Sequence, residues 1–325
     1  MKKFLSLVLM LFAINSFAEN VKKIAIVRYK IPPHDFIECV NGFKSEMNNL
    51  GFIEGKNVEY LDFLTSTSDM KSTPEVQKFV NENKDKVDLF VTLGWVGLPT
   101  REIIKGTKIP QIYNLVFRPF GEKITGTTLD KASGSNITGV YLTYPPEKIV
   151  KLLKLVKPNA KKYGIVINSQ IPADGFFKKW YEEATSTDKN GVEFVYYDLA
   201  IGLDKVIEAI KKDSLDAFGG GVGLRQASSK PLFSLGIPLV TAKLDWFEQD
   251  KVKGTDELIA HYNPFDAAGI QIAKIAKEIL SGKNPGEMIP QAVEKQLVFI
   301  NLDAATRLKI NIPTAVLKQA AVVIK

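Results

Sequence analysis

Large polar or aromatic residues stand directly after three apolar runs in the first half of this 325-residue chain. Arg28 and Tyr29 follow the first run, Gly94 and Trp95 follow the second, and Arg118 follows the third. A guanidinium group binds a carboxylate or a phosphate through paired hydrogen bonds, and an aromatic ring stacks on a flat apolar molecule. This combination indicates a binding site for a small molecule that is aromatic or anionic.

The sequence lacks the motifs of common enzymes. It contains no Gly-x-Ser-x-Gly motif and no Walker-type phosphate loop. The two histidines, His34 and His261, do not have metal-ligand spacing, and nothing requires Asp62 and Asp245 to act together as acids. The single cysteine, Cys39, lies in the apolar rhythm of a helix and is predicted to be buried. We expect no enzymatic activity, no catalytic residue, no cofactor and no metal site.

The apolar runs are predicted strands that alternate with amphipathic helices. Thr73 opens a helix with Pro74 at its first position, and Gly282 ends the long helix that starts at Pro264. Such an alternation forms parallel sheets through right-handed crossovers. We predict strands at 24–28, 58–63, 88–93, 110–117, 163–167, 192–197, 215–218, 238–241, 258–261 and 296–300, and helices at 36–50, from 73, 175–184, 203–211, 224–235, 264–282 and 302–309.

The same order of elements occurs twice, which indicates two similar lobes. DLFVTLGWVGLPTREIIKGTKIP (88–110) and DAFGGGVGLRQASSKPLFSLGIP (216–238) both run from strand through glycine turn and helix to a new strand, with the same 22-residue step from Asp to Pro. We therefore predict an α/β fold of two doubly wound, Rossmann-like lobes with a cleft between them. A loop rich in Gly, Thr and Ser (121–135) leads to residues 137–142, which we interpret as a crossing between the lobes.

Open α/β sheets bind ligands beyond the carboxyl ends of their strands, and this rule selects the candidate site. Glycines at these ends let a ligand approach backbone N–H groups, and the helix that follows favours an anionic group. Two alternatives stay open, because Trp95 can pack on its own lobe and either arginine can form an interlobe or surface ion pair. The candidate ligand-binding residues are Arg28, Tyr29, Gly94, Trp95, Asn114, Arg118, Tyr141, Asn168, Ser169, Gly220, Asp245 and Trp246.

The first 18 residues have the pattern of a secretory signal peptide. Two lysines at 2–3 precede an 11-residue apolar run, and Ser-Phe-Ala at 16–18 fits the cleavage rule for small residues. The run is shorter than the roughly 20 residues that span a membrane. We expect cleavage before Glu19 and a protein located in the periplasm.

The distribution of charge along the chain indicates which classes of partner the protein binds. The net charge of +7 is spread along the chain, and no arginine-rich arm or aromatic-spaced basic motif is present. Such a distribution is typical of solvated faces and gives no indication of nucleic-acid binding. We expect a monomer that binds a small molecule and no nucleic acid.

Several segments, in chain order, resemble one known family. They are FIEGKNV (52–58), NITGV (136–140), KPNAKK (157–162), GIPLV (236–240) and FINLDAA (299–305), followed by Ile312-Pro313. Together they resemble the ABC-transporter substrate-binding proteins whose better-known members bind tryptophan or other aromatic amino acids. The resemblance spans nearly the whole mature chain. It implies a type I periplasmic binding fold, with two lobes joined by three crossing segments near 136–142, 259–264 and 285–296.

The resemblance also implies domain boundaries and a role. After the signal peptide (1–18), the N-terminal lobe is expected to comprise 19–137 plus about 263–288, and the C-terminal lobe 138–262 plus about 289–325. The implied role is to capture a small molecule between the lobes and deliver it to an ABC permease. The alternative is a periplasmic sensor that engages a membrane signalling receptor, which needs the same cleft and hinge.

Two positions depart from the pattern of that family. Its members typically carry Asp-Pro after the fourth strand, where this chain has Arg118-Pro119, and an acidic residue in the third turn of the second lobe, where this chain has Gly219–Gly221. If those acids pair with a ligand's ammonium group, both partners are lost here. Amino-acid specificity is therefore not carried over, and Arg28 and Arg118 are the expected partners of an anionic ligand.

Overall fold

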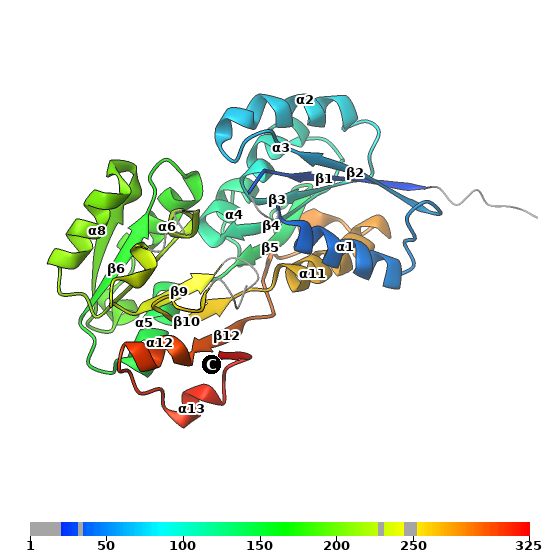
Figure 1. Ribbon diagram of the computed structural model, residues 1–325. Helices are drawn as coiled ribbons and strands as arrows, with labels where there is room; N and C mark the ends of the chain where they lie inside the picture. The colour runs from blue at the N-terminus through cyan, green and yellow to red at the C-terminus, as the bar shows by residue number, and fades with distance from the viewer. Residues whose placement is uncertain (1–20, 32–34, 227–230, 244–251) are drawn as a thin grey trace, which may run out of the picture.

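Two sheets covered by helices form the two lobes of the computed structural model, which describes residues 21–31, 35–226, 231–243 and 252–325 (Figure 1). The first sheet has the strand order β11-β5-β4-β3-β1-β2, and the second has the order β13-β12-β10-β9-β8-β6-β7. Neighbouring strands are parallel, except that β10 and β12 are antiparallel. The predicted α/β fold of two doubly wound lobes is confirmed.

The first lobe consists mainly of the N-terminal part of the chain, with one helix and one short strand from the C-terminal part. Its strands are β1 (Lys22–Arg28), β2 (Val58–Leu64), β3 (Leu89–Leu93), β4 (Gln111–Phe117), β5 (Ile137–Leu142) and β11 (Gln291–Ala292). Its helices are α1 (Ile37–Asn49), α2 (Thr73–Asn83), α3 (Gly97–Ile104), α4 (Arg118–Thr125) and α11 (Phe265–Leu280).

The second lobe repeats the alternation of strand and helix. Its strands are β6 (Lys162–Ile167), β7 (Glu193–Asp198), β8 (Ala217–Gly220), β9 (Leu239–Lys243), β10 (Glu257–Tyr262), β12 (Leu297–Asn301) and β13 (Val322–Ile324). Its helices are α5 (Pro146–Val156), α6 (Pro172–Glu182), α7 (Ser186–Lys189), α8 (Leu203–Lys212), α9 (Val222–Gln226), α12 (Leu302–Arg307) and α13 (Thr314–Leu317).

The central strands are buried because helices cover both faces of each sheet (Figure 1). All residues of β3 and β4 are buried, which matches the near-continuous apolar sequence that a parallel sheet requires. The parallel strands of the two sheet centres have their carboxyl ends at the side that faces the other lobe (Figure 1). The sheets therefore direct the loops at their carboxyl ends towards a common region.

Helices α1 and α11 lie in close contact against the first sheet. A β-carbon on Gly42 would lie 2.2 Å from the carbonyl oxygen of Asp266, and one on Gly269 would lie 2.1 Å from that of Cys39. Only glycine permits such an approach of two backbones. Cys39 is buried in this contact, as its apolar rhythm predicts.

Some segments differ from the sequence predictions. Residues 137–142 are not a crossing but strand β5, which pairs with β4 and β11 of the first sheet. The chain passes between the sheets a few residues later, at 143–145, and again at 263–264 and 293–296. Helix α4 occupies the start of the predicted loop at 121–135. Of the helix predicted at 224–235, the described parts are α9 and a 3₁₀ turn at Leu232–Ser234.

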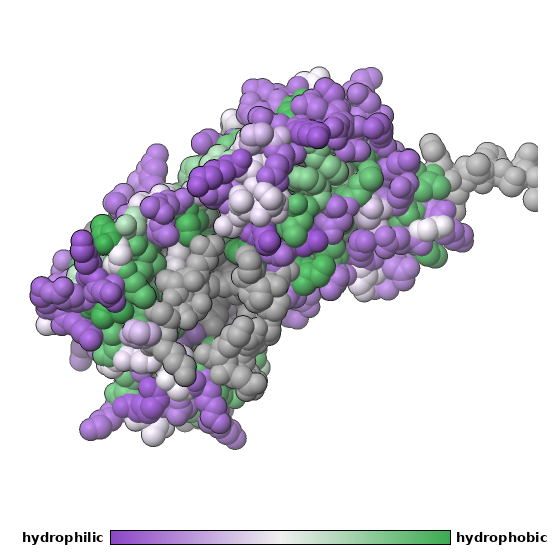
Figure 2. Space-filling view, turned by 45° about the horizontal axis from the view of Figure 1, so that its top comes forward, coloured by the Kyte–Doolittle hydropathy of each residue, from purple (hydrophilic) through white to green (hydrophobic). Residues whose placement is uncertain are grey.

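The outer surface of the first lobe is mostly hydrophilic in the view of Figure 2. Large hydrophobic residues that are exposed within the described ranges come from separate elements: Val21, Ile37, Ile53, Met70, Ile201 and Ile289. Across the same ranges, no helix combines the length and the apolar composition that a membrane span needs. The predicted signal peptide lies outside the described residues.

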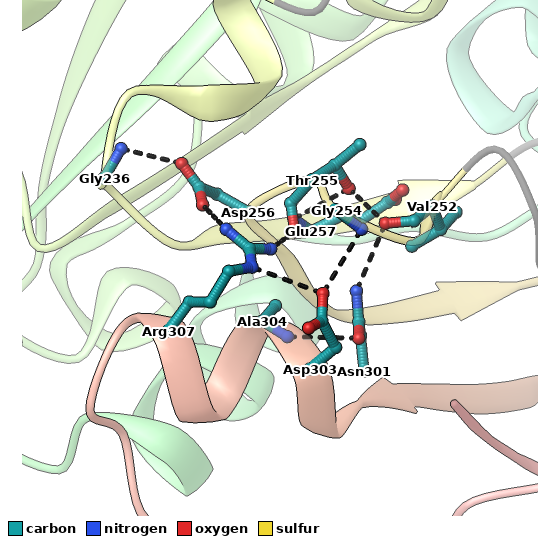
Figure 3. Close-up of polar contacts among 10 residues, drawn as sticks. All are labelled: Gly236, Val252, Gly254, Thr255, Asp256, Glu257, Asn301, Asp303, Ala304 and Arg307. Atoms are coloured by element: carbon teal, nitrogen blue, oxygen red, sulfur yellow. Dashed lines mark hydrogen bonds and ion pairs between the residues drawn. The ribbon is translucent and has the colours of Figure 1, made fainter. Parts of the chain in front are cut away.

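A polar network joins α12 to the start of β10, at the end of the second sheet that faces away from the first lobe (Figure 3). Arg307 donates from Nη1 to Asp256 Oδ1 (2.8 Å) and from Nε to Asp303 Oδ2 (3.2 Å). The buried Asp256 also accepts a hydrogen bond from the Gly236 backbone (2.7 Å). This network lies at the amino-terminal ends of β9 and β10, away from the carboxyl ends of these strands.

Candidate functional site

A pocket lies between the two sheets, at the carboxyl ends of their strands. The first lobe contributes the loops after β1, β2 and β3, the ends of β4 and β5, and the starts of α4 and α11. The second lobe contributes the loop after β6 and the starts of α6 and α9. This is where open α/β sheets bind ligands. The lining residues are Tyr29, Ile31, Phe36, Ser68, Asp69, Gly94, Trp95, Leu115, Val116, Phe117, Phe120, Leu142, Gln170, Ile171, Pro172, Ala173, Val222 and Phe265.

Six aromatic residues of the first lobe line the pocket, and four of them, Tyr29, Phe36, Trp95 and Phe265, are in ring contact with one another. The ring centroid of Tyr29 lies 4.9 Å from that of Phe36 and 5.7 Å from that of Trp95, and Phe36 lies 5.6 Å from Phe265. The Tyr29 ring fits because Gly94 (φ 78°) has no β-carbon, which would lie 2.2 Å from the ring. The structure thus brings three of the sequence-predicted residues, Tyr29, Gly94 and Trp95, to one wall.

Trp95 both packs on its own lobe and lines the pocket, the two roles that the sequence left open. Its side chain packs in its own lobe and is only 7% exposed, and its indole Nε1 donates a hydrogen bond to the carbonyl oxygen of Ser68 (3.2 Å). The same residue lines the pocket. Because a fixed ring loses little entropy when a ligand binds, this packing prepares the wall for stacking.

Two large lining residues have left-handed backbone conformations. Phe36 has φ 62° and Leu115 has φ 57°, which is strained for residues other than glycine. Arg28 Nη1 donates to the carbonyl oxygen of Asp35 (2.7 Å), next to Phe36. Asn114 Oδ1 accepts a hydrogen bond from the Leu115 backbone (2.7 Å). Arg28 and Asn114 are therefore placed behind the lining, where they support the strained residues.

The remaining hydrogen bonds of Arg28 go to one carboxylate. Its Nε and Nη2 donate to the two carboxylate oxygens of Asp62, each at 2.8 Å. This is the bidentate geometry that the sequence analysis assigned to an anionic ligand. In the structure the partner is a residue of the neighbouring strand β2.

Arg118 lies in the first turn of α4 and is not part of the pocket lining. Its Nε donates to Glu122 Oε1 (3.1 Å), and its Nη2 lies 3.5 Å from Asp130 Oδ1. Its guanidinium carbon lies 5.9 Å from the ring centroid of Tyr141, another predicted residue outside the lining. These contacts give Arg118 partners within its own lobe.

In the second lobe, a buried carboxylate fills the turn that was expected to receive an anion. Asp174 accepts hydrogen bonds from the backbone N–H groups of Asn168 (2.8 Å), Val222 (2.6 Å) and Gly223 (2.8 Å). A β-carbon on Gly221 would lie 2.2 Å from Asp174 Oδ1. The glycine run therefore accommodates an internal carboxylate. Burial raises the pKa of Asp174 to about 6, although these hydrogen bonds oppose the shift.

The other predicted second-lobe residues are also placed outside the lining or beyond the described residues. The Ser169 backbone donates to Asp198 Oδ1 (3.0 Å). Gly220 lies within β8, where a β-carbon would be 2.0 Å from a carbonyl oxygen of β6, so its role there is close packing. Asp245 and Trp246 lie outside the described residues, and the structure provides no test of them.

Polar side chains are few in the lining. Ser68, Asp69 and Gln170 contribute them, and Asp69 is the one charged residue among the described lining residues. The sequence analysis missed these residues and most of the apolar wall, including Phe120 and Phe265. A usable signal was available for Phe265, because Pro264 marks a helix start at the same edge of the sheet.

The structure shows where one of the two histidines lies and whether described side chains are grouped as metal ligands. His261 lies within β10, whereas His34 is outside the described ranges. Among the residues the structure describes, no group of three or more His, Cys, Asp or Glu side chains is arranged to hold a metal ion.

Comparison with known proteins identifies the family. A profile described as "ABC transporter substrate binding protein" matches residues 23–197 and 257–324. A curated "Tyrosine-binding protein" from Clostridioides difficile (strain R20291) is 24% identical over 276 residues, covering 81% of this chain and 74% of the relative.

Solved structures agree in fold. An ABC domain in complex with L-Trp from Streptococcus pneumonia has a TM-score of 0.76 and 19% identity, covering 94% of this chain and 100% of that chain. A ligand-free, open substrate-binding protein with adhesive properties from Clostridium difficile has a TM-score of 0.72 and 19% identity, with the same coverage. These similarities confirm the type I periplasmic binding fold, and the profile match shows that this chain belongs to the ABC transporter substrate-binding protein family.

Proposed function

We propose that this protein captures a small molecule with a flat aromatic part between its lobes and delivers it to an ABC permease. The observation that carries the proposal is the wall formed by Tyr29, Phe36, Trp95 and Phe265 at the carboxyl ends of the first sheet. An aromatic ligand gains about 0.5–1.5 kcal/mol from each favourable ring contact beyond the burial of its area. The tyrosine and tryptophan named for the two relatives belong to this class of ligand.

The proposal includes export, a monomeric state and the absence of catalysis. The support for export is the N-terminal pattern, with a charged start, a short apolar run and small residues at 16–18. Intact-mass measurement of the exported protein should give a chain that starts at Glu19. A mass that retains residues 1–18 would contradict cleavage.

A binding experiment tests the ligand class. Purified protein is titrated with L-tryptophan, L-tyrosine and L-leucine while its thermal unfolding is followed. A ligand at 100 times its Kd adds about 2.7 kcal/mol to the free energy of unfolding, so an aromatic ligand should raise the unfolding temperature more than L-leucine does. Stabilisation by L-leucine alone would overturn the aromatic proposal.

A pair of tryptophan variants locates the binding site. Trp95→Leu should weaken binding of the aromatic ligand because a wall ring is lost. Trp180→Leu is the matched control, since Trp180 packs against Tyr181 on α6 (ring centroids 6.2 Å apart) and is not part of the pocket lining. Equal affinities of the two variants would place the ligand elsewhere.

A further inference from the structure

The loop after β2 brings an acidic side chain to the pocket. Ser68 and Asp69 of this loop belong to the lining, on the same wall as Trp95. The loop is joined to that wall through the hydrogen bond from Trp95 Nε1 to the Ser68 carbonyl oxygen (3.2 Å). A charged group next to an aromatic wall can determine which ligands that wall accepts.

Hydrogen bonds within the loop hold it in place. Thr65 Oγ1 donates to the carbonyl oxygen of Thr67 (2.6 Å), and the Thr67 backbone donates to Ser72 Oγ (3.2 Å). The Ser66 backbone donates to Glu75 Oε2 (2.9 Å) on α2. These bonds connect the loop to a helix and give Asp69 a fixed position, as a binding group requires.

The Asp69 carboxylate is set up to stay ionised. Its Oδ1 accepts hydrogen bonds from Thr67 Oγ1 (2.9 Å) and from the Lys71 backbone (3.1 Å). The hydrogen bond from the Thr67 hydroxyl lowers the pKa of Asp69; loss of hydration opposes this shift, and the Lys71 backbone and charge add to it. Each of these bonds favours the charged form, so the group is an anion at neutral pH.

The second carboxylate oxygen of Asp69, whose side chain is 43% exposed, is engaged in a surface ion pair. Within the described part of the chain, its ion-pair partner is Lys71 Nζ at 3.6 Å, and the Lys71 side chain is 87% exposed. An exposed pair of this kind contributes little and is readily exchanged. The two arginines predicted for an anionic ligand, Arg28 and Arg118, pair with carboxylates of their own lobe outside the lining.

We propose that Asp69 is the specificity-determining residue that selects a ligand carrying a cationic nitrogen beside its aromatic part. The inference rests on the proposed aromatic pocket and adds the charge of the ligand to it. An ammonium group at Asp69 would displace Lys71 and form a charge-assisted hydrogen bond with Asp69 Oδ2. A ligand whose only charge is negative would meet like charge there.

Three indole probes that differ in charge test the inference by calorimetric titration. Tryptamine carries an ammonium group, indole-3-propionate carries a carboxylate, and L-tryptophan carries both. We expect the wild-type protein to bind tryptamine more tightly than indole-3-propionate. Asp69→Asn should weaken tryptamine and L-tryptophan binding roughly ten- to a hundredfold, without weakening indole-3-propionate. Asparagine keeps an oxygen that can cap the following turn, so the variant should fold.

Controls separate charge from loop structure. Lys71→Ala should leave tryptamine binding unchanged or slightly stronger, because it removes only an exposed competitor for Asp69. Arg118→Gln should leave indole-3-propionate binding unchanged. If Asp69→Asn binds tryptamine as well as wild type does, or if wild type prefers indole-3-propionate, the inference is overturned while the aromatic pocket stands. Binding of none of the three indoles would overturn the proposed ligand class and the inference together.

Discussion

The carboxylate of Asp174 accepts three backbone hydrogen bonds although its side chain is fully buried. Burial raises its pKa to about 6, above the unfolded value of about 3.9. The folded protein therefore binds more protons than the unfolded chain between about pH 4 and pH 6. We predict that this group lowers the free energy of unfolding by on the order of 2–3 kcal/mol as the pH rises through this window.

Urea unfolding at a series of pH values measures this contribution. Asp174→Asn cannot ionise, so the difference in unfolding free energy between wild type and variant should change between pH 4 and pH 6 and level off above. Asp198→Asn is the matched control. Burial raises the pKa of Asp198, but hydrogen bonds from Ser169 and Ala200 outweigh it and lower the pKa overall, so the stability from Asp198 is lost as the pH falls. The same slope in both variants would contradict the assignment.

A residue of the site could be predicted from the sequence where its position directly after a strand is enough to put it at the pocket. Gly94 and Trp95 follow β3 directly, so the rule for strand ends places them at the pocket. Arg28 satisfies the same rule, but its bidentate carboxylate partner is Asp62, 34 residues away on β2. The chain reveals that a guanidinium stands at a strand end. It does not reveal which carboxylate the register of two strands will bring to it.

The strained residues Phe36 and Leu115 could not be predicted from the sequence either, because contacts with other parts of the chain position them. Phe36 and Leu115 enter the lining through left-handed backbone conformations, which local sequence disfavours for large side chains. Arg28 donates to the Asp35 carbonyl oxygen, and Asn114 Oδ1 accepts from the Leu115 backbone. These two side chains are themselves held by hydrogen bonds to Asp62 and to the carbonyl oxygen of Ala268, which lie 34 and 154 residues away in the chain. Long-range contacts, rather than local preference, therefore decide this part of the wall.

At the scale of elements, the contact between α1 and α11 positions two of the wall rings. Phe36 precedes α1, Phe265 begins α11, and Gly42 lies at their contact. A methyl group at Gly42 would overlap the backbone of Asp266. We predict that Gly42→Ala separates the helices, lowers the unfolding temperature and weakens ligand binding. Thermal unfolding and titration with the aromatic ligand measure the two effects.

A second glycine gives the control for that substitution. Gly175 lies in α6 with no atom within 4 Å of an added β-carbon. Alanine has the higher helix propensity by about 1 kcal/mol, so Gly175→Ala should leave the protein equally stable or more stable. If Gly42→Ala behaved like Gly175→Ala, the close helix contact would not control stability.

Strands could be predicted where they bury long apolar runs. They could not be predicted where they form only by pairing with an adjacent strand. Strands β1, β3 and β4 match their predicted positions closely because continuous burial requires apolar residues throughout. Strand β11 forms by pairing with β5. It has only two residues, which are too few to show a periodic pattern in the sequence. Residues 137–142 were interpreted as a crossing between the lobes, which is wrong, because their place in the first sheet follows from pairing with β4.

At the scale of the whole molecule, the three connections between the lobes are bonded to one another. The Asn263 backbone donates to the Tyr144 hydroxyl (3.1 Å), which joins the second connection to the first. Asn263 Nδ2 donates to the carbonyl oxygen of Lys295 (3.1 Å), which joins it to the third. Thin connections of this kind permit a rigid-body rotation of two lobes, and we expect these bonds to couple the three connections into one hinge.

An aromatic contact joins α4 of the first lobe to α6 of the second, and we predict that it favours the closed arrangement of the lobes. The Phe120 ring on the first lobe lies 4.9 Å from the Phe176 ring on the second. Phe120 belongs to the pocket lining, whereas Phe176 does not. Removing one ring of such a pair costs about 0.5–1.5 kcal/mol beyond area burial. Phe176→Ala should therefore shift the ligand-free protein towards an open form without removing a residue that contacts the ligand.

Solution scattering and calorimetric titration together test this shift. For wild type, saturating aromatic ligand should lower the radius of gyration because the ligand favours the closed form. Ligand-free Phe176→Ala should have a larger radius than wild type and reach the same compact value when saturated. Its affinity should fall by roughly two- to tenfold, because part of the binding energy now closes the lobes.

Phe79→Ala is the matched control, since the Phe79 ring stacks on Phe63 within the first lobe (4.6 Å). This variant should lose stability while keeping the wild-type radius and affinity. If Phe176→Ala kept the wild-type radius with and without ligand, the α4–α6 contact would not control closure. If wild type showed no change in radius at saturation, hinge closure itself would be refuted, and the pocket would have to admit its ligand with the lobes fixed.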